Sequence, residues 1–133
     1  MKYLLDTHSF LWTLFDDAKL PERAREIIKD PDNDIFVSVT TNWEISLKYA
    51  IGKLEFEGIT PDELPEKSKM IGIETLQILE EEASSFYRLQ KTKHKDPFDR
   101  MIIWQAIKRN LTLISKDEGI KIYKPLGLKF LWK

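Results

Sequence analysis

The chain has 133 residues, 42% hydrophobic and 32% charged, which is enough to bury the core of one globular domain spanning 1–133. The absence of cysteine excludes a disulfide framework and a thiolate zinc site. The net charge of −1 provides no general attraction to nucleic acid, so a polyanionic substrate would need local basic groups or metal ions. No apolar run approaches the ~20 residues of a membrane span, and the start of the chain lacks a signal peptide pattern. We therefore expect a cytoplasmic protein without membrane contact.

Residues 2–6, KYLLD, are a short apolar run ending in an acid, which predicts a buried strand followed by an apolar helix over 7–14. Amphipathic spacing predicts a helix over 21–30, with Pro21 near its start. The run DIFVSV predicts a second strand at 34–39.

The middle of the chain continues this alternation. A helix is predicted over 40–54, and Gly52 is expected to end it. Residues 60–72 begin as a helix whose interior Pro65 should interrupt. A third strand is predicted at 73–79.

The last third contains a predicted helix over 80–91 and the strongest helical pattern of the chain over 97–109. A fourth strand is predicted at 111–115, and 128–132 is left open as a short fifth. Strands separated by helices predict an α/β fold with a central, mostly parallel sheet of four or five strands and right-handed crossovers. In such a sheet, sites form at the carboxyl ends of the strands.

Acidic residues stand where several of these elements meet. Asp6 ends the first strand, Glu44 lies in the segment after the second, and Asp117 comes two residues past the fourth. Asp96 and Asp99 begin the helix that leads into the fourth strand. A parallel sheet would bring at least Asp6, Glu44 and Asp117 to one edge.

Helix capping is the alternative explanation for these acids, since an acid in the first helical turn stabilises it by ~0.3–1 kcal/mol. Thr41 with Glu44, and Ser115 with Glu118, fit the spacing of a capping box. Asp96 precedes a proline, which is typical of a helix cap. Each acid taken alone therefore remains open to this interpretation.

Two features favour a metal site. Asp99 lies inside the first turn and heads the apolar stripe of Ile102, Ile103 and Ala106, where an unpaired carboxylate is costly. Clustered carboxylates repel one another by about 1–4 kcal/mol per pair at ~4 Å, so they must take up protons or cations. An all-oxygen set suits Mg²⁺ or Mn²⁺, and we expect nearby helix N-termini to keep the acids ionised. These ions support phosphodiester hydrolysis.

Four segments in this order resemble the PIN-domain family: YLLDTHSFLW, TNWEISLKYAIGKL, HKDPFDRMIIWQA and LTLISKDEGI. The order and spacing are similar to those of VapC-type toxins of type II toxin–antitoxin modules. The resemblance covers nearly the whole chain, and DPFDR before an apolar helix is its most distinctive part. The match departs after Asp117, where Glu118-Gly119 replaces the aromatic-containing segment expected from the family.

The resemblance implies a three-layer α/β/α sandwich and an endonuclease for single-stranded RNA that depends on Mg²⁺ or Mn²⁺. It further implies a homodimer and silencing by a cognate antitoxin through an inserted arginine or a blocking helix. The implied metal-binding and catalytic residues are Asp6, Glu44, Asp99 and Asp117, with Asp96 as an accessory acid or helix cap and with Thr7 and Ser115 as nearby hydroxyl groups.

Basic and imidazole groups have both functional and purely structural interpretations. His8 could bind a metal or move a proton, or simply begin the first helix. Lys93 and Lys95, with Lys91, form a basic run around His94 that could guide phosphate or be a solvated loop. Arg100 could contact substrate phosphate, orient a carboxylate, or form a surface salt bridge.

The four tryptophans could stack bases, although core or dimer packing is the better explanation for most of them. The apolar stretch SFLWTLF at 9–15 is a candidate subunit or antitoxin interface.

Two other functions remain for comparison. A receiver-type signalling module has an acidic metal pocket in an α/β fold of this size. It needs paired acids after the first strand and a phosphorylatable aspartate ending the third, whereas Asp6 stands alone and the third run ends in Leu79. A PIN nuclease with a housekeeping role in RNA processing would carry the same acids as a toxin.

Overall fold

The structure is a computed structural model that describes residues 1–90 and 92–133. Its strands are β1 (Lys2–Leu5), β2 (Asp34–Ser38), β3 (Ile73–Leu76), β4 (Thr112–Ile114) and β5 (Lys129–Leu131). Its α-helices are α1 (Thr7–Phe15), α2 (Glu22–Lys29), α3 (Val39–Ala50), α4 (Leu64–Met70), α5 (Glu80–Ser85) and α6 (Pro97–Arg109). Its 3-10 helices are η1 (Asp17–Lys19), η2 (Pro61–Glu63), η3 (Phe86–Arg88) and η4 (Glu118–Leu126).

The five strands form one sheet in the order β3-β2-β1-β4-β5, and each neighbouring pair is parallel. The predicted parallel α/β fold is confirmed, with 128–132 supplying the fifth strand. The chain runs outward from β1 to β3 and then returns to β4 on the other side of β1, so the strand order reverses between β1 and β4. A receiver-type module would have the order 2-1-3-4-5 instead, which excludes that alternative.

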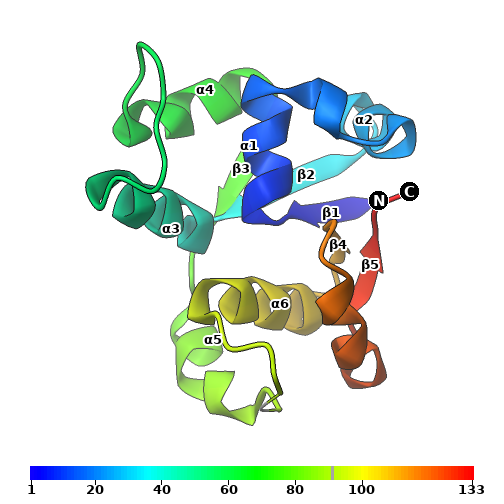
Figure 1. Ribbon diagram of the computed structural model, residues 1–133. Coiled ribbons are helices and arrows are strands. Elements are labelled where there is room, and N and C mark those ends of the chain that lie inside the picture. Colours follow the sequence, from blue (N-terminus) through cyan, green and yellow to red (C-terminus); the bar gives the residue numbers. More distant parts are fainter. Residues whose placement is uncertain (91) are drawn as a thin grey trace.

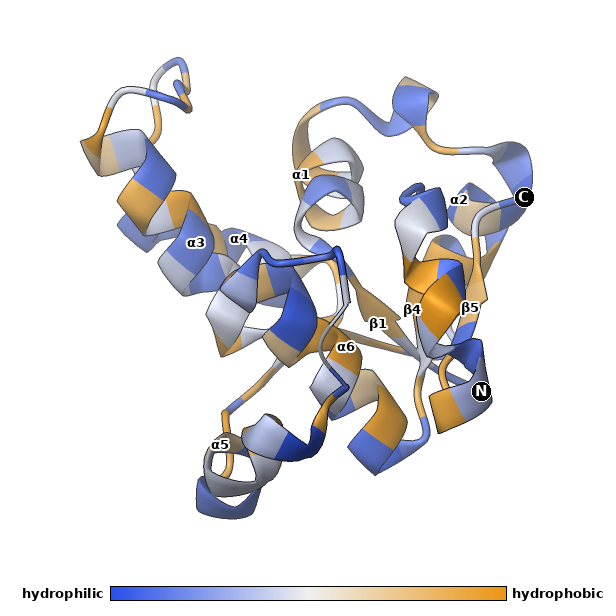
Figure 2. Cartoon of the chain, turned by 60° about the horizontal axis from the view of Figure 1, so that its bottom comes forward, coloured by the Kyte–Doolittle hydropathy of each residue, from blue (hydrophilic) through white to orange (hydrophobic). Residues whose placement is uncertain are grey.

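Helices cover both faces of the sheet (Figure 1), with α1, α2 and α4 on one side and α5 and α6 on the other. Side chains alternate along β1 because successive residues of a strand point to opposite faces. Tyr3 and Leu5 pack in one buried cluster with Phe10 of α1, whereas Leu4 packs in a second cluster with Ile103 of α6. Figure 2 shows hydrophobic colouring along β1 and mixed colouring on α3 and α6. The molecule is therefore a three-layer α/β/α sandwich.

Several predicted elements are longer than those in the structure, and two differ most clearly at their ends. The strand predicted at 73–79 ends at Leu76. The helix predicted at 80–91 ends at Ser85 and is followed by η3, and Lys91 lies outside the described residues. Local apolar patterns locate an element but define its ends poorly. Among the described helices, none is long and apolar enough to cross a membrane.

Two local signals at helix ends are confirmed. The Asp96 side chain caps α6 by accepting hydrogen bonds from the backbone N–H groups of Phe98 and Asp99, at 2.9 and 3.4 Å. Gly52 follows the end of α3 with φ of +77°, a conformation that favours glycine. The expected interruption at Pro65 is wrong, because Pro65 lies in the first turn of α4, where its missing N–H is not needed.

Candidate metal centre

Two predicted acids lie where the strand order reverses. Asp6 directly follows β1 and Asp117 follows β4, and the backbone N–H of Asp6 donates to the Ile114 carbonyl at 3.2 Å. Both acids also cap helices: Asp6 Oδ1 accepts from the Ser9 N–H and Asp117 Oδ1 accepts from the Gly119 N–H, each at 2.8 Å. Each cap uses one carboxylate oxygen, so capping and metal binding are compatible roles.

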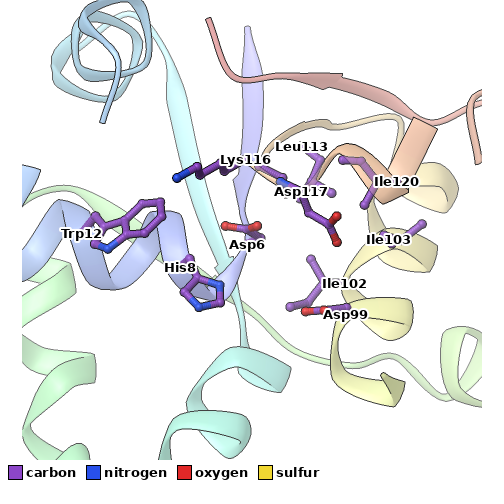
Figure 3. A pocket seen from close by; sticks show the side chains of 11 residues that line it. Asp6, His8, Trp12, Asp99, Ile102, Ile103, Leu113, Lys116, Asp117 and Ile120 are labelled. Carbon is purple, nitrogen blue, oxygen red and sulfur yellow. Dashed lines mark hydrogen bonds between the residues drawn. The ribbon is translucent and has the colours of Figure 1, made fainter. Parts of the chain in front are cut away.

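The carboxylates of Asp6, Asp99 and Asp117 line one pocket of about 330 Å³. They come from three elements, the ends of β1 and β4 and the first turn of α6, and gather around the same space (Figure 3). Lys116 and His8 also line this pocket. The parallel sheet thus assembles acids that are far apart in the sequence.

Asp99 is the centre of this charge cluster. Burial raises its pKa to about 7, with further contributions from the carboxylates of Asp96, Glu44, Asp6 and Asp117, in that order. Burial also raises the pKa of Asp6. Burial of both acids, and like charge at Asp99, therefore oppose the effect of the nearby helix N-termini, which favours the ionised form. A bound cation would remove this electrostatic penalty.

Ser115 connects the acids of the two strand ends. It is buried, its hydroxyl oxygen accepts from the Asp117 N–H at 3.1 Å, and its hydrogen bond to Asp6 lowers the pKa of that carboxyl against the larger effect of burial. The capping box suggested for Ser115 and Glu118 is wrong, since Asp117 is the residue that caps η4.

Glu44 is buried on α3, with 2% of its surface exposed. The hydroxyl of Thr7 donates to Glu44 Oε1 at 2.6 Å and Lys48 Nζ donates to Glu44 Oε2 at 2.5 Å. The capping box suggested for Thr41 and Glu44 is wrong, because α3 begins earlier and Ser38 caps it. Thr41 instead hydrogen-bonds to Thr7 at 3.1 Å, so both hydroxyl groups orient this side of the cluster.

The described residues contain two groups whose ligand atoms lie within 4.8 Å of one another. One group is Glu44, Asp96 and Asp99, and the other is His94, Asp99 and Asp117. Asp99 belongs to both, which makes it the carboxylate shared between two neighbouring positions. Carboxylate oxygens dominate this donor set, and such a set fits Mg²⁺ or Mn²⁺.

His94 is the functional candidate that the sequence pattern missed. Its Nε2 lies 3.3 Å from Asp117 Oδ2 and 3.6 Å from Asp99 Oδ2. His94 was considered only as part of the basic run. Its position two residues before the helix cap Asp96 was a signal that it could lie near the acids. Lys93, its neighbour in that run, is exposed, as is Lys95.

Arg100 is buried, which excludes the surface salt bridge among its three possible roles. Its guanidinium donates to the backbone carbonyls of Leu89 and Gln90 and to the Tyr123 hydroxyl, at 3.1 to 3.2 Å, and lies over the Phe86 ring. These contacts turn the charged group toward the segment before α6. Arg100 therefore holds that segment in place in this structure.

Aromatic side chains surround the acids. His8 is exposed and lies 5.6 Å from the Trp12 ring. Trp43 is 62% exposed and packs edge-on against Phe98, whereas Trp104 is buried in the core as expected. Trp43 is therefore the tryptophan most accessible for contact with a ligand near α6.

The geometry agrees with comparisons to known proteins. A sequence model described as PIN domain matches residues 3–124. No curated protein sequence matches the chain.

Solved structures with a similar fold include VapBC2 from Rickettsia felis bound to a DNA fragment from their promoter (18% identity, 100% of both chains, TM-score 0.67). VapBC-1 from nontypeable Haemophilus influenzae (18%, TM-score 0.66) and DNA-bound VapBC from Salmonella typhimurium (20%, TM-score 0.66) each cover 98% of this chain and 97% of theirs. From the family match, which spans nearly its whole length, the chain belongs to the PIN domain family.

Proposed function

We propose that this protein is an endonuclease that cleaves single-stranded RNA with the help of Mg²⁺ or Mn²⁺. One observation carries the proposal: four other carboxylates act on Asp99 in a partly buried pocket at the reversal of strand order. Such a concentration of negative charge destabilises the protein unless cations bind. PIN domains are generally nucleases, which agrees with this chemistry.

The acids divide into two sets that meet at Asp99. Asp6 and Asp117 would hold an ion with Asp99 on the pocket side, and Glu44 and Asp96 would complete a position on the α3 side. Divalent ions in this setting make bound water a better nucleophile and stabilise the leaving oxygen of a phosphodiester. Thr7 and Ser115 orient the carboxylates by hydrogen bonding. We expect 5′-phosphate and 3′-hydroxyl ends, by analogy with the family.

Basic groups near the acids would replace the missing overall positive charge. Lys116 lines the pocket and Lys48 pairs with Glu44 on its α3 side. Lys93 and Lys95 are exposed on the segment that leads into α6. We assign these four lysines to contacts with substrate phosphates, and we assign Arg100 to positioning of the same segment.

The test is cleavage of total RNA by purified protein with Mg²⁺, with Mn²⁺, or with EDTA, followed by mapping of the new ends. Asp99→Asn should abolish cleavage while the protein stays folded. The matched control is Asp32→Asn, which removes an exposed charge in the turn between α2 and β2. Wild-type cleavage by the Asp99 variant in excess Mg²⁺ would defeat the proposal.

We further propose that the protein is the toxin of a VapBC-type module and binds a cognate antitoxin. The similar structures are VapBC proteins. The interface expected at 9–15 overlaps a groove of about 700 Å³ whose lining includes Leu11, Trp12, Phe15, Phe56 and Lys53. This groove would receive an apolar antitoxin segment.

A housekeeping nuclease for RNA processing is the remaining alternative. Expression of the chain alone should arrest growth of cells if it is a toxin, and a small neighbouring gene should relieve the arrest. Growth without arrest, combined with RNA cleavage in vitro, would favour the processing role. We place either activity in the cytoplasm.

A homodimer is the expected state of the free protein. The outer side of α3 exposes Trp43 and Leu47, and Ile51 continues the same stripe, which is the kind of surface that subunit contacts cover. Leu47→Glu should convert a dimer to a monomer in light scattering. A monomeric wild-type protein would remove this part of the proposal.

A further inference from the structure

His94 faces the carboxylates that would hold the metal, and nothing in the predicted quartet accounts for it. Its side chain is 16% exposed and its Nε2 lies 3.3 Å from Asp117 Oδ2 and 3.6 Å from Asp99 Oδ2. Neighbouring ligand atoms around an ion with bonds of about 2.1 Å are about 3 Å apart. The three ligand atoms all lie within 4.8 Å of one another, so a small adjustment brings them to the spacing of donors to one ion.

The other ring nitrogen of His94 has its own partner. Nδ1 lies 3.4 Å from the hydroxyl of Tyr123, a fully buried residue whose ring packs edge-on against the imidazole. Histidine ligands of metals commonly have this second contact, which sets the tautomer and the orientation of the ring. His94 thus has the surroundings of a metal ligand on both nitrogens.

The hydrogen bonds around Tyr123 are compatible with an unprotonated Nε2. Arg100 can only donate, so the Tyr123 oxygen accepts from it at 3.1 Å. The second lone pair of that oxygen can accept from His94 Nδ1–H, while the phenolic proton goes to Thr92 Oγ1 at 3.1 Å. In this arrangement the contacts around Tyr123 are satisfied, and the lone pair of Nε2 faces the carboxylates, where an ion between them would accept it.

The backbone of His94 is also held. Its N–H donates to Thr92 Oγ1 at 3.0 Å, and its carbonyl lies 3.5 Å from Arg100 Nη1. The ring is therefore not a freely rotating surface group. A preorganised imidazole loses little conformational entropy when a metal binds.

We propose that His94 is a nitrogen ligand of the metal centre and that it makes the position shared by Asp99 and Asp117 prefer Mn²⁺ over Mg²⁺. The inference rests on the proposed metal-dependent function. Carboxylates alone suit both ions, whereas imidazole is a better ligand for transition metals than for Mg²⁺. The position formed by Glu44, Asp96 and Asp99 has oxygen donors only and carries no such preference.

The experiment measures metal binding directly, without RNA. Mn²⁺ and Mg²⁺ affinities are determined by calorimetry for the wild-type protein, His94→Ala and His8→Ala, and pulsed electron paramagnetic resonance detects ¹⁴N coupling to bound Mn²⁺. The chain has two histidines, so the two variants cover all of its imidazole groups. His8 lines the same pocket and is the matched control.

We expect ¹⁴N coupling in the wild type and in His8→Ala and its loss in His94→Ala. The Mn²⁺ affinity of His94→Ala should fall about 10–100-fold, while its Mg²⁺ affinity changes much less. Because the substitution could loosen the segment before α6, the same measurements on Tyr123→Phe provide a second check. That variant keeps His94 and should retain the ¹⁴N coupling with a weaker Mn²⁺ affinity.

Unchanged ¹⁴N coupling in His94→Ala, or an unchanged ratio of Mn²⁺ to Mg²⁺ affinity, would overturn the proposal. Tighter Mn²⁺ binding by His94→Ala would also overturn it, because His94 would then compete with the metal for the acids. Nitrogen coupling without RNA cleavage would refute the nuclease function and leave the ligand assignment intact. Cleavage with Mg²⁺ but no ¹⁴N coupling would refute the ligand assignment and leave the nuclease function intact.

Discussion

Asp99→Asn should stabilise the metal-free protein at neutral and alkaline pH. The pKa of Asp99 is raised from 3.8 to about 7 by burial and by the surrounding acids. The folded state therefore binds a proton more tightly than the unfolded chain, and ionisation of Asp99 opposes folding. This destabilisation is absent below about pH 4, grows between pH 4 and 7, and is complete above pH 7.

The full pKa difference corresponds to about 4 kcal/mol. The Asp99 side chain is 36% exposed, so solvent screening reduces this value, and we expect about 2 kcal/mol. Asparagine keeps the shape of the side chain and removes the charge. In EDTA at pH 8 the variant should melt roughly 6–10 °C above the wild type, with the gain shrinking toward pH 4.

The assay is thermal unfolding followed by circular dichroism at pH 4, 6 and 8, in EDTA and in excess Mg²⁺. Asp32→Asn is the control for loss of one negative charge. Added Mg²⁺ should raise the melting temperature of the wild type and have less effect on Asp99→Asn, which lacks the shared ligand. Our reasoning is refuted if Asp99→Asn melts at or below the wild-type temperature at pH 8 in EDTA, or if its gain is equal at pH 4.

Three further predictions follow from single contacts. Asp96→Ser should keep the cap of α6 while Asp96→Ala loses about 1 kcal/mol in urea unfolding, and a weaker response of the serine variant to Mg²⁺ would identify Asp96 as a ligand rather than only a cap. Arg100→Lys should lower the free energy of unfolding by about 2 kcal/mol, because a single ammonium group cannot replace the planar guanidinium that donates to several carbonyls. A stability equal to that of the wild type would contradict this. Thr7→Val should cost about 1–3 kcal/mol in the same assay because Glu44 loses its hydroxyl partner, and an unchanged urea midpoint would show that the contact is not needed.

Local chemistry was enough to place most elements of this protein. Apolar runs of five to seven residues indicated each strand, and their alternation with helical patterns predicted the α/β class and the parallel direction. The cap at Asp96 and the glycine after α3 could also be predicted, because a helix end depends on a few adjacent residues. The end of β3, and the end of α5 within the helix predicted over 80–91, could not be predicted, since tertiary packing decides where such weak elements stop.

The order of the acids along the chain was visible in the sequence, but what surrounds them was not. Glu44 is paired with a hydroxyl 37 residues away, and Arg100 with one 23 residues away. Neither partner lies near the residue that it contacts in the sequence, so the sequence could not predict these two hydrogen bonds. The pKa of Asp99 likewise depends on its burial and on four acids, three of which come from other segments of the chain.

The sequence by itself determined that parallel strands would bring acids to one edge of the sheet. The alternation of strands with helices predicts the strand direction, and the position of each acid after its strand is read directly from the sequence. Only the tertiary structure decided that Asp99 would lie at the centre of those acids and that His94 would face them. The physical reason is that electrostatic energy depends on distances of a few ångströms, which packing of the whole sandwich sets.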